Sequence, residues 1–342
     1  MNFTTPELST TSPSNNSFVF KDYQQRLTVA IIACTISAIG VPGNTLVILA
    51  VTLSKRLQTR TNFFIVNLSC ADLLTCFTLP VQAYTVLHDE LPLPTRVCKA
   101  LAVLMWLGVG SSIISLALIA VVRFYVITKP RQTYTQVFRK RNLILLTLLA
   151  WLTPLSLMII PPCFGVGEIG YSVKYKFCMT SSSNKWHDLF SSLNGIVVPI
   201  PCLFVIIVCY TRIYLFVRRV SLDVLLLANC GPCEARTATS PRTTLEIALF
   251  RRQVTVAKNL FLVVCSYLLC VMPFGVNCSL PSYTYAALPW TFIFFCVTCC
   301  INPILYGLKH PQFQEVLCLH LSGPWRRRGA EREPLLRPSR NT

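Results

Sequence analysis

Apolar residues in this chain form seven long runs, each at least as long as the roughly 20 residues that cross the hydrocarbon core of a bilayer. The runs lie near residues 27–53, 62–87, 95–128, 142–163, 189–217, 250–280 and 286–308. Backbone amide groups in lipid need hydrogen-bond partners within the chain, which predicts an α-helix for each run. The strands of a membrane barrel would alternate apolar and polar residues over about ten positions, and these runs do not. The pattern therefore predicts an all-α membrane protein, a seven-transmembrane helix bundle.

Composition supports this class. Of the 342 residues, 53% are hydrophobic and 13% are charged, whereas about a quarter of residues are charged in soluble domains. We find no internal repeat and no second domain, and seven spans do not divide into the paired halves of many transporters. The expected organisation is a polar tail at 1–26, the helix bundle at 27–308, and an amphipathic helix with a further tail at 309–342.

The formal charge of +18 raises the possibility of nucleic-acid binding, so the distribution of the cations has to be considered. Placing alternate connections on opposite sides of a membrane puts the basic clusters at 55–60, 129–141, 218–252 and 324–340 on one face. The positive-inside rule then predicts a multi-pass plasma-membrane protein with its amino terminus outside and its carboxy terminus in the cytoplasm. Nucleic-acid binding is the weaker interpretation of the charge.

Most of the 17 cysteines lie inside apolar runs, where a thiol behaves as a small hydrophobic group. Cys98 begins the third run and Cys178 lies in the outside loop after the fourth, an oxidising location, so we expect a disulfide that ties this loop to the bundle. Cys230 and Cys233 form a C-x-x-C pair for which ordinary thiols are favoured over a metal or redox role. In the outer tail, Asn2 and Asn15 start glycosylation sequons.

Polar side chains inside the apolar runs are the candidates for function. Asp72 stands in the middle of the second run, and a carboxylate at that depth marks a functional pocket with a partner. Asn44, Ser112 and Asn302 are expected at a similar depth. Together these oxygens and amides suit a small hard cation or a water cluster, and the alternative is a hydrogen-bonded packing node without an ion.

The seventh run ends in Asn302-Pro303-Ile-Leu-Tyr306. Pro303 removes one backbone hydrogen bond and is expected to bend the helix at that turn, while Asn302 satisfies freed polar groups or reaches Asp72. Such a bend can act as a hinge between two packings, or it can be a static kink of the kind common in membrane helices. Pro273 predicts a second bend in the sixth run.

The segment after Tyr306 has apolar residues at helical spacing and is predicted to form a short amphipathic eighth helix along the inner membrane surface. Cys318 in this helix is a candidate palmitoylation site or a free thiol. Arg326 to Arg328 suit contact with anionic membrane lipids, and a disordered soluble tail is the alternative.

These marks together resemble those of the rhodopsin-like (class A) G protein-coupled receptors, and the resemblance covers nearly the whole chain. In order they are Gly43-Asn44, Leu68 and Asp72, Cys98, Arg123 with Pro130, Trp151, Cys178, Tyr210, Pro273-Phe274, and Asn302-Pro303 with Tyr306. The segments Arg60 to Phe64 and Asn67 to Asp72 also resemble those of the melatonin receptors and the medium-chain fatty-acid receptor.

The resemblance implies roles for the matching positions. Asp72, Ser112 and Asn302 would hold a sodium ion as an allosteric modulator, the one cofactor expected. The switch residues would be Pro273, Asn302 and Pro303, with Arg123, Tyr210 and Tyr306 supporting an open state that meets a heterotrimeric G protein.

Three departures from the family pattern change these expectations. The family's Asp-Arg-Tyr is Val122-Arg123-Phe124 here, and Gln253 occupies a position where many members carry Glu. This favours elevated signalling without ligand, whereas apolar contacts from Val122 could equally keep the receptor quiet. Val271 replaces the usual Trp of the sixth helix, so ligand coupling is expected through Tyr267 or Phe274. Pro199 and Pro201 predict a bulge or register shift in the fifth helix.

The expected ligand is not an amine, because Met105 occupies the position where aminergic receptors carry an Asp. The predicted cavity is apolar, and Lys176 is one of several lysines at its mouth, which suits a lipid-like or acidic small molecule unless these lysines are only solvated loop residues. The predicted ligand-binding residues are Met105, Trp106, Val109, Tyr267, Phe274 and Lys176.

The predicted function is thus a receptor that binds an extracellular ligand and activates a G protein. The alternative is an atypical or decoy receptor that binds ligand without activating one. An enzyme or transporter is disfavoured, because the four histidines lie in loops or the tail and Asp72 has no second carboxylate for acid–base chemistry.

Overall fold

The computed structural model describes residues 19–181, 186–229, 254–255, 261, 265, 268–277, 286–309 and 313–314. Its helices are α1 (Tyr23–Leu53), α2 (Arg60–Leu87), α3 (Thr95–Thr128), α4 (Arg131–Val137), α5 (Lys140–Cys163), α6 (His187–Ile196), α7 (Pro199–Asn229), α9 (Leu288–Cys296) and α10 (Thr298–Lys309), with a 3₁₀ turn at Lys55–Leu57. Six helical spans in this part of the chain are long and apolar enough to cross a membrane, and the apolar helix Leu268–Asn277 lies in the sixth predicted run.

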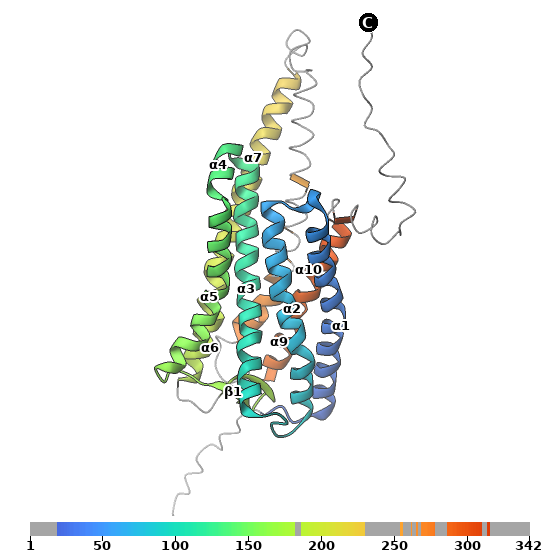
Figure 1. Cartoon of the computed structure of the whole chain (residues 1–342), viewed down its shortest axis with the longest axis vertical. Helices are drawn as coiled ribbons and strands as arrows, with labels where there is room; N and C mark the ends of the chain where they lie inside the picture. Colours follow the sequence, from blue (N-terminus) through green and yellow to red (C-terminus); the bar gives the residue numbers. More distant parts are fainter. Residues whose placement is uncertain are drawn as a thin grey trace, which may run out of the picture.

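The long helices run side by side as a bundle (Figure 1). Helix α3 is central, because it packs against α2, α5 and α7, whereas α1 packs against α2 and α10. Small residues permit the close approaches that van der Waals packing between membrane helices needs. A Cβ atom on Gly108 of α3 would lie 2.8 Å from the carbonyl oxygen of Ala71 in α2, so only glycine fits there.

Helices α1 and α2 start where side chains can cap them. The carboxylate of Asp22 accepts a hydrogen bond of 2.9 Å from the amide of Gln24 at the start of α1. The hydroxyl of Thr59 accepts one of 3.2 Å from Asn62 at the start of α2. Each cap satisfies an amide that lacks a partner within its helix.

The fifth span is interrupted just before the two prolines, where the sequence predicted a bulge or register shift. Helix α6 ends at Ile196 and α7 begins at Pro199. Pro199 and Pro201 both fall in the first turn of α7, where a missing amide hydrogen costs no helical hydrogen bond.

The seventh span is interrupted before it reaches the proline that is predicted to bend it. The break lies at Val297, between α9 and α10, while Pro303 remains inside α10. At the break the amides of Val297 and Cys300 bond to carbonyls three residues earlier, at 3.2 Å and 3.1 Å, so the turn is tightened before the proline is reached.

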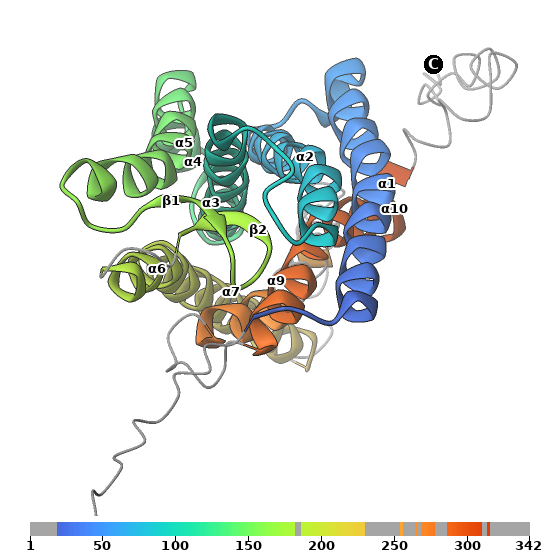
Figure 2. The ribbon, with the colours of Figure 1, turned by 90° about the horizontal axis from the view of Figure 1, so that it is seen from below.

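A two-stranded hairpin covers one end of the bundle, which we call the hairpin end. Strands β1 (Ile169–Ser172) and β2 (Phe177–Thr180) pair antiparallel, with Tyr171 opposite Cys178. Viewed from this end, the hairpin lies across the end of α3 (Figure 2). The predicted disulfide between Cys98 and Cys178 is present and joins β2 to α3.

Candidate functional site

A fully buried carboxylate stands at the centre of the bundle. Asp72 on α2 has no exposed surface. One of its oxygens accepts a hydrogen bond of 2.8 Å from the hydroxyl of Ser112 on α3, and the other accepts one of 2.8 Å from the amide of Asn302 on α10. Asp72 therefore connects three helices, and the structure brings together the three residues that the sequence grouped.

Asn44 of α1 belongs to the same region but makes a different contact from the one expected. Its amide nitrogen donates to the carbonyl oxygen of Cys299 at 2.8 Å and to that of Gly40 at 2.9 Å. Cys299 is four residues before Pro303, so its carbonyl is the one that loses its helical partner to the proline. The side chain of α1 thus replaces the missing hydrogen bond of α10, and Asn302 is left to bind Asp72.

A second polar cluster supports the first from the α5 side. The indole of Trp151 donates to the amide oxygen of Asn67 at 2.8 Å, and the amide nitrogen of Asn67 donates to Ser115 at 2.7 Å. Every residue of this cluster lies within a helix. Asn67, which starts a glycosylation sequon in the sequence, is 7% exposed and serves as a link between α2, α3 and α5.

Towards the hairpin end, an apolar cavity of about 250 Å³ lies between α3, α6, α7 and the helix Leu268–Asn277. It is open towards the outside of the bundle, where Ile200, Met272 and Val276 of its lining are 56%, 49% and 49% exposed. It adjoins a smaller cavity of about 30 Å³ that reaches α5 and α9, and the two share Ile113, Gly195, Pro199, Val271 and Gly275. Almost all of the lining is apolar. Asn194 is the exception in the smaller cavity, where its amide nitrogen bonds to the carbonyl of Phe190 at 2.9 Å.

Aromatic rings connect this cavity to the hairpin. Phe177 of β2 lies 5.3 Å from Phe292 between ring centroids, and Phe292 lies 5.7 Å from Phe274. Phe274 also contacts Phe295 at 5.4 Å and Trp106 at 6.2 Å. Val271 lines the cavity in place of the Trp that the family pattern carries, and Phe274 occupies the centre of the aromatic cluster.

The predicted ligand-binding residues divide into two groups. Trp106, Val109 and Phe274 line the smaller cavity. Met105 instead lies beneath the hairpin, with its sulfur 3.7 Å from the side-chain nitrogen of Gln82. Lys176 is 6% exposed, and its ammonium group donates to the backbone carbonyl of Asp89.

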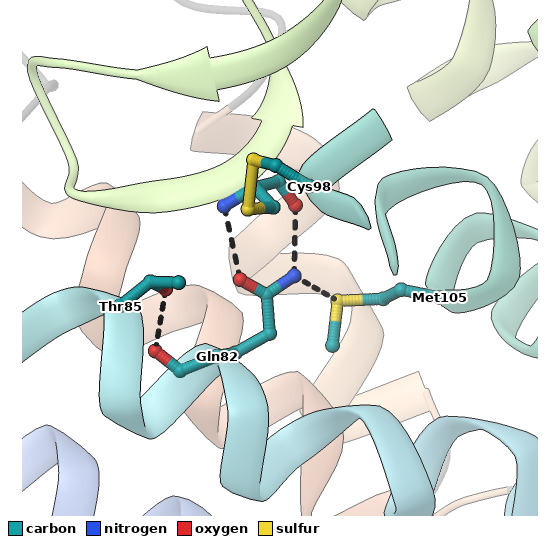
Figure 3. The surroundings of a disulfide bond; sticks show 5 residues. Gln82, Thr85, Cys98 and Met105 are labelled. Carbon is teal, nitrogen blue, oxygen red and sulfur yellow. Dashed lines mark hydrogen bonds between the residues drawn. A yellow bond between two sulfur atoms is a disulfide. The ribbon is translucent and has the colours of Figure 1, made fainter. Parts of the chain in front are cut away.

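A clamp that the sequence did not indicate holds the hairpin in place. Gln82 of α2 is 1% exposed, and its side-chain amide bonds to both backbone groups of Cys178. It accepts from the Cys178 amide at 2.9 Å and donates to the Cys178 carbonyl at 2.8 Å, as a neighbouring strand would (Figure 3). The hairpin is therefore tied to α2 by hydrogen bonds and to α3 by the disulfide.

Charged groups add further ties at this end. Arg26 of α1 is buried and forms an ion pair of 2.8 Å with Asp89, and the amide of Phe20 bonds to the Lys174 carbonyl at 2.8 Å. Nearby, burial raises the pKa of the Tyr171 phenol to about 12, an effect that Arg26 opposes and Asp89 reinforces. Lys99 lies 3.9 Å from Glu168, so Lys99 and Lys176 both interact with other parts of the chain.

The end opposite the hairpin, which we call the Arg123 end, gathers three predicted switch residues. Arg123, Tyr210 and Tyr306 are 6%, 8% and 2% exposed, and the guanidinium group interacts electrostatically with both phenols. The hydroxyls of Tyr210 and Tyr306 have no hydrogen-bond partner in the part of the chain that the structure describes. Phe313 stacks on Tyr306, with ring centroids 5.9 Å apart.

Several predicted positions lie outside the described residues. These are Tyr267, Gln253, the sequon residues Asn2 and Asn15, and Cys318. Pro273 lies within the helix Leu268–Asn277. Of the predicted amphipathic segment after Tyr306, residues 307–309, 313 and 314 are described.

Comparisons with known proteins agree with this geometry. Residues 43–306 match the 7 transmembrane receptor (rhodopsin family) profile. The alpha-1A adrenergic receptor of Oryzias latipes is 30% identical over 302 residues, which cover 81% of this chain and 63% of that receptor. Melatonin receptor type 1B-B of Danio rerio is 28% identical, over 84% of this chain and 80% of that receptor.

The chain therefore spans less than two thirds of the length of the first of these relatives. Among solved structures, the crystal structure of squid rhodopsin superimposes with a TM-score of 0.76 at 22% sequence identity. The match covers 92% of this chain and 89% of that one. At this identity the similarity establishes the architecture of a seven-helix bundle.

Proposed function

Because this chain belongs to the rhodopsin family of 7 transmembrane receptors, we propose that it binds an extracellular ligand in the apolar cavity and in response activates a heterotrimeric G protein. Membership of a receptor family confirms the expectation of a multi-pass membrane receptor that is not an enzyme. The ligand, the transducer and the orientation in the membrane form the proposal.

In the proposed orientation the hairpin end faces the outside and the Arg123 end faces the cytoplasm. Basic residues support it, because the clusters at 55–60, 129–141 and 218–219 all belong to the Arg123 end or to connections there. The disulfide at the hairpin end is also suited to an oxidising compartment.

One observation carries the proposal. The group formed by Asp72, Ser112 and Asn302, which we call the Asp72 centre, lies between the cavity and the Arg123 end and connects α2, α3 and α10. A ligand that fits one helix packing better than another shifts the population towards that packing. Since Asn302 on α10 bonds to Asp72 and Tyr306 lies one turn further along the same helix, a change in this packing reaches the group around Arg123.

The cavity favours an apolar ligand over an acidic one. Its lining is almost entirely hydrophobic and aromatic, with Asn194 as a polar group that can orient a ligand. Two of the cationic groups that would attract an acid have contacts within the chain, since Lys176 bonds to the backbone carbonyl of Asp89 and Lys99 lies 3.9 Å from Glu168. We therefore propose a lipid-like, non-aminergic ligand.

The residues around Asp72 also fit a sodium ion. A carboxylate and a hydroxyl supply the hard oxygen ligands that such an ion prefers, and the amide oxygen of Asn44 is buried without a hydrogen-bond partner in the described part of the chain. Asp72, Ser112 and Asn302 would hold the ion, with Asn44 beside them. A bound ion would supply positive charge that compensates the buried carboxylate.

The test is a screen of apolar lipids, with small acids and amines as comparison classes, on cells that express the receptor with a panel of G protein biosensors. The expected hit is an apolar compound whose response is lost in Phe274→Ala and kept in Tyr84→Ala, an exposed aromatic on α2. Ligand-driven internalisation without nucleotide exchange on any G protein would establish the decoy alternative instead. A response confined to amines would overturn the proposed ligand class.

A further inference from the structure

A second apolar site lies on the outside of the bundle, at the Arg123 end. A groove of about 500 Å³ runs between α7 and the sixth span, and it is lined on the α7 side by Ile206, Ile207, Tyr210, Thr211, Ile213, Tyr214 and Val217. The other wall carries Val254, Phe261, Cys265 and Leu268, whose spacings of seven, four and three residues describe one face of a helix. Ile207 and Tyr214 are 53% and 63% exposed, so the groove opens towards the surroundings of the bundle.

The length of this groove matches one leaflet of a membrane. From Ile206 to Val217 the axis of α7 rises roughly 16 Å, at about 1.5 Å per residue. Half of the hydrocarbon core of a bilayer is about 15 Å thick. The groove therefore has the length of one lipid acyl chain and lies in the half of the bundle that holds Arg123.

Charge marks one end of the groove. Arg218 directly follows Val217, the last lining residue of α7, and lies seven residues after Thr211, which is two helical turns on nearly the same face. Its side chain is exposed and makes no ion pair with any other residue in the described ranges. A hydroxyl at Thr211 adds a polar group within the groove.

We propose that this groove binds a phospholipid with an anionic headgroup, whose phosphate meets Arg218 and whose acyl chain fills the space between α7 and the sixth span. The proposal rests on the orientation given above, because the cytoplasmic leaflet carries the anionic lipids. A neutral apolar molecule would use the walls of the groove and leave the cation at its end uncompensated. The combination of an acyl-length groove with a basic end thus favours a charged lipid.

The site is connected to the switch residues through Tyr210. The ring of Tyr210 on α7 contacts that of Phe261 on the opposite wall, with 5.2 Å between centroids, and Tyr210 also interacts electrostatically with Arg123. A lipid chain wedged beside this ring pair holds α7 and the sixth span at one separation. Lipid composition would then bias the packing at the Arg123 end without contact with the ligand cavity.

The test is native mass spectrometry of the purified full chain, equilibrated with dioleoyl phosphatidylserine or dioleoyl phosphatidylcholine. We expect one phosphatidylserine to survive at activation energies that remove phosphatidylcholine. Arg218→Ala should weaken this retention by about fivefold, the effect of one basic residue near an anionic lipid. Arg212→Ala is the matched control, because Arg212 is also an exposed cation of α7 but lies about 120° around the helix from Arg218.

A second variant separates the groove from the charge. Thr211→Trp fills the groove and leaves Arg218 intact, so it should abolish retention if the acyl chain lies between the helices. Equal losses in Arg218→Ala and Arg212→Ala would overturn the site in favour of general electrostatic attraction. Retention of phosphatidylcholine equal to that of phosphatidylserine, or displacement of both by cholesterol, would also overturn it. None of these readouts depends on G protein activation, so the two proposals fail separately.

Discussion

Replacing Gln82 by Leu removes the hydrogen-bond clamp on the hairpin while keeping a side chain of similar size. The wild-type amide satisfies the amide and the carbonyl of Cys178 at 2.9 Å and 2.8 Å, in a position where both residues are buried. Each backbone group left unpaired costs about 1–3 kcal/mol. The two together predict a loss of about 2–6 kcal/mol in the free energy of unfolding.

The expected change in melting temperature follows from this loss. At about 2 °C per kcal/mol, the lower end of the range for large domains, the variant should melt roughly 4–12 °C below the wild type. Thermal unfolding can be followed with a thiol-reactive fluorophore, because several free cysteines, including Cys76, Cys296 and Cys299, are buried in the folded protein. Gln58→Leu is the control, since Gln58 is exposed and the change should stay within about 0.5 kcal/mol.

A double-mutant cycle tests whether the clamp and the disulfide hold the same strand. In Cys98→Ala the disulfide is absent, so the Gln82 hydrogen bonds already contribute less to the free energy of unfolding. The two changes should therefore be non-additive by at least about 0.5 kcal/mol. Two results would contradict this role of the clamp. One is a melting temperature of Gln82→Leu equal to that of Gln58→Leu, and the other is a double variant in which the stability losses of Gln82→Leu and Cys98→Ala simply add.

Three further predictions follow from the interior of the bundle. With NaCl replacing KCl at constant ionic strength, the wild type should melt at a higher temperature and Asp72→Asn should show no difference, whereas an equal response in both would exclude Asp72 from a sodium site. Gly108→Ala should lower the free energy of unfolding by about 1–3 kcal/mol, because its Cβ would lie 2.8 Å from a backbone carbonyl of α2, while Gly307→Ala, with nothing within 4 Å, should not. Val122→Asp should lower ligand-independent nucleotide exchange, because it places a carboxylate beside Arg123. If membranes that carry the wild type show no more basal exchange than mock membranes, the expectation of elevated signalling is wrong.

The Asp72 centre shows which contacts residue type alone can predict. A lone carboxylate in an apolar run has to be compensated, and the sequence alone therefore indicates Ser112 and Asn302 as its partners. The contact of Asn44 with the Cys299 carbonyl could not be foreseen, because it depends on which face of α1 meets α10. For the same reason the sequence did not indicate the interruption at Val297, or that a side chain of α1 would bond to the carbonyl that Pro303 frees.

The hairpin end shows where residue type misleads. Lys176 was expected to meet a ligand because it is a cation in an outside loop, yet it is buried and bonded to Asp89. Met105 was expected in the cavity from its position along α3, and it lies under the hairpin against Gln82. Gln82 itself had a signal, a buried amide in an apolar run, but nothing in the sequence indicates a partner 96 residues away.

The amino-acid sequence alone determined the membrane spans, their helical state and the identity of the buried carboxylate. These properties are local, because a segment enters lipid according to its own hydropathy and satisfies its own backbone hydrogen bonds. The tertiary structure decided which polar groups meet, which cations remain exposed and where grooves are left between helices. Those depend on the rotation of each helix about its axis, which is set by side-chain packing between segments as far apart as Asp72 and Asn302, 230 residues along the chain.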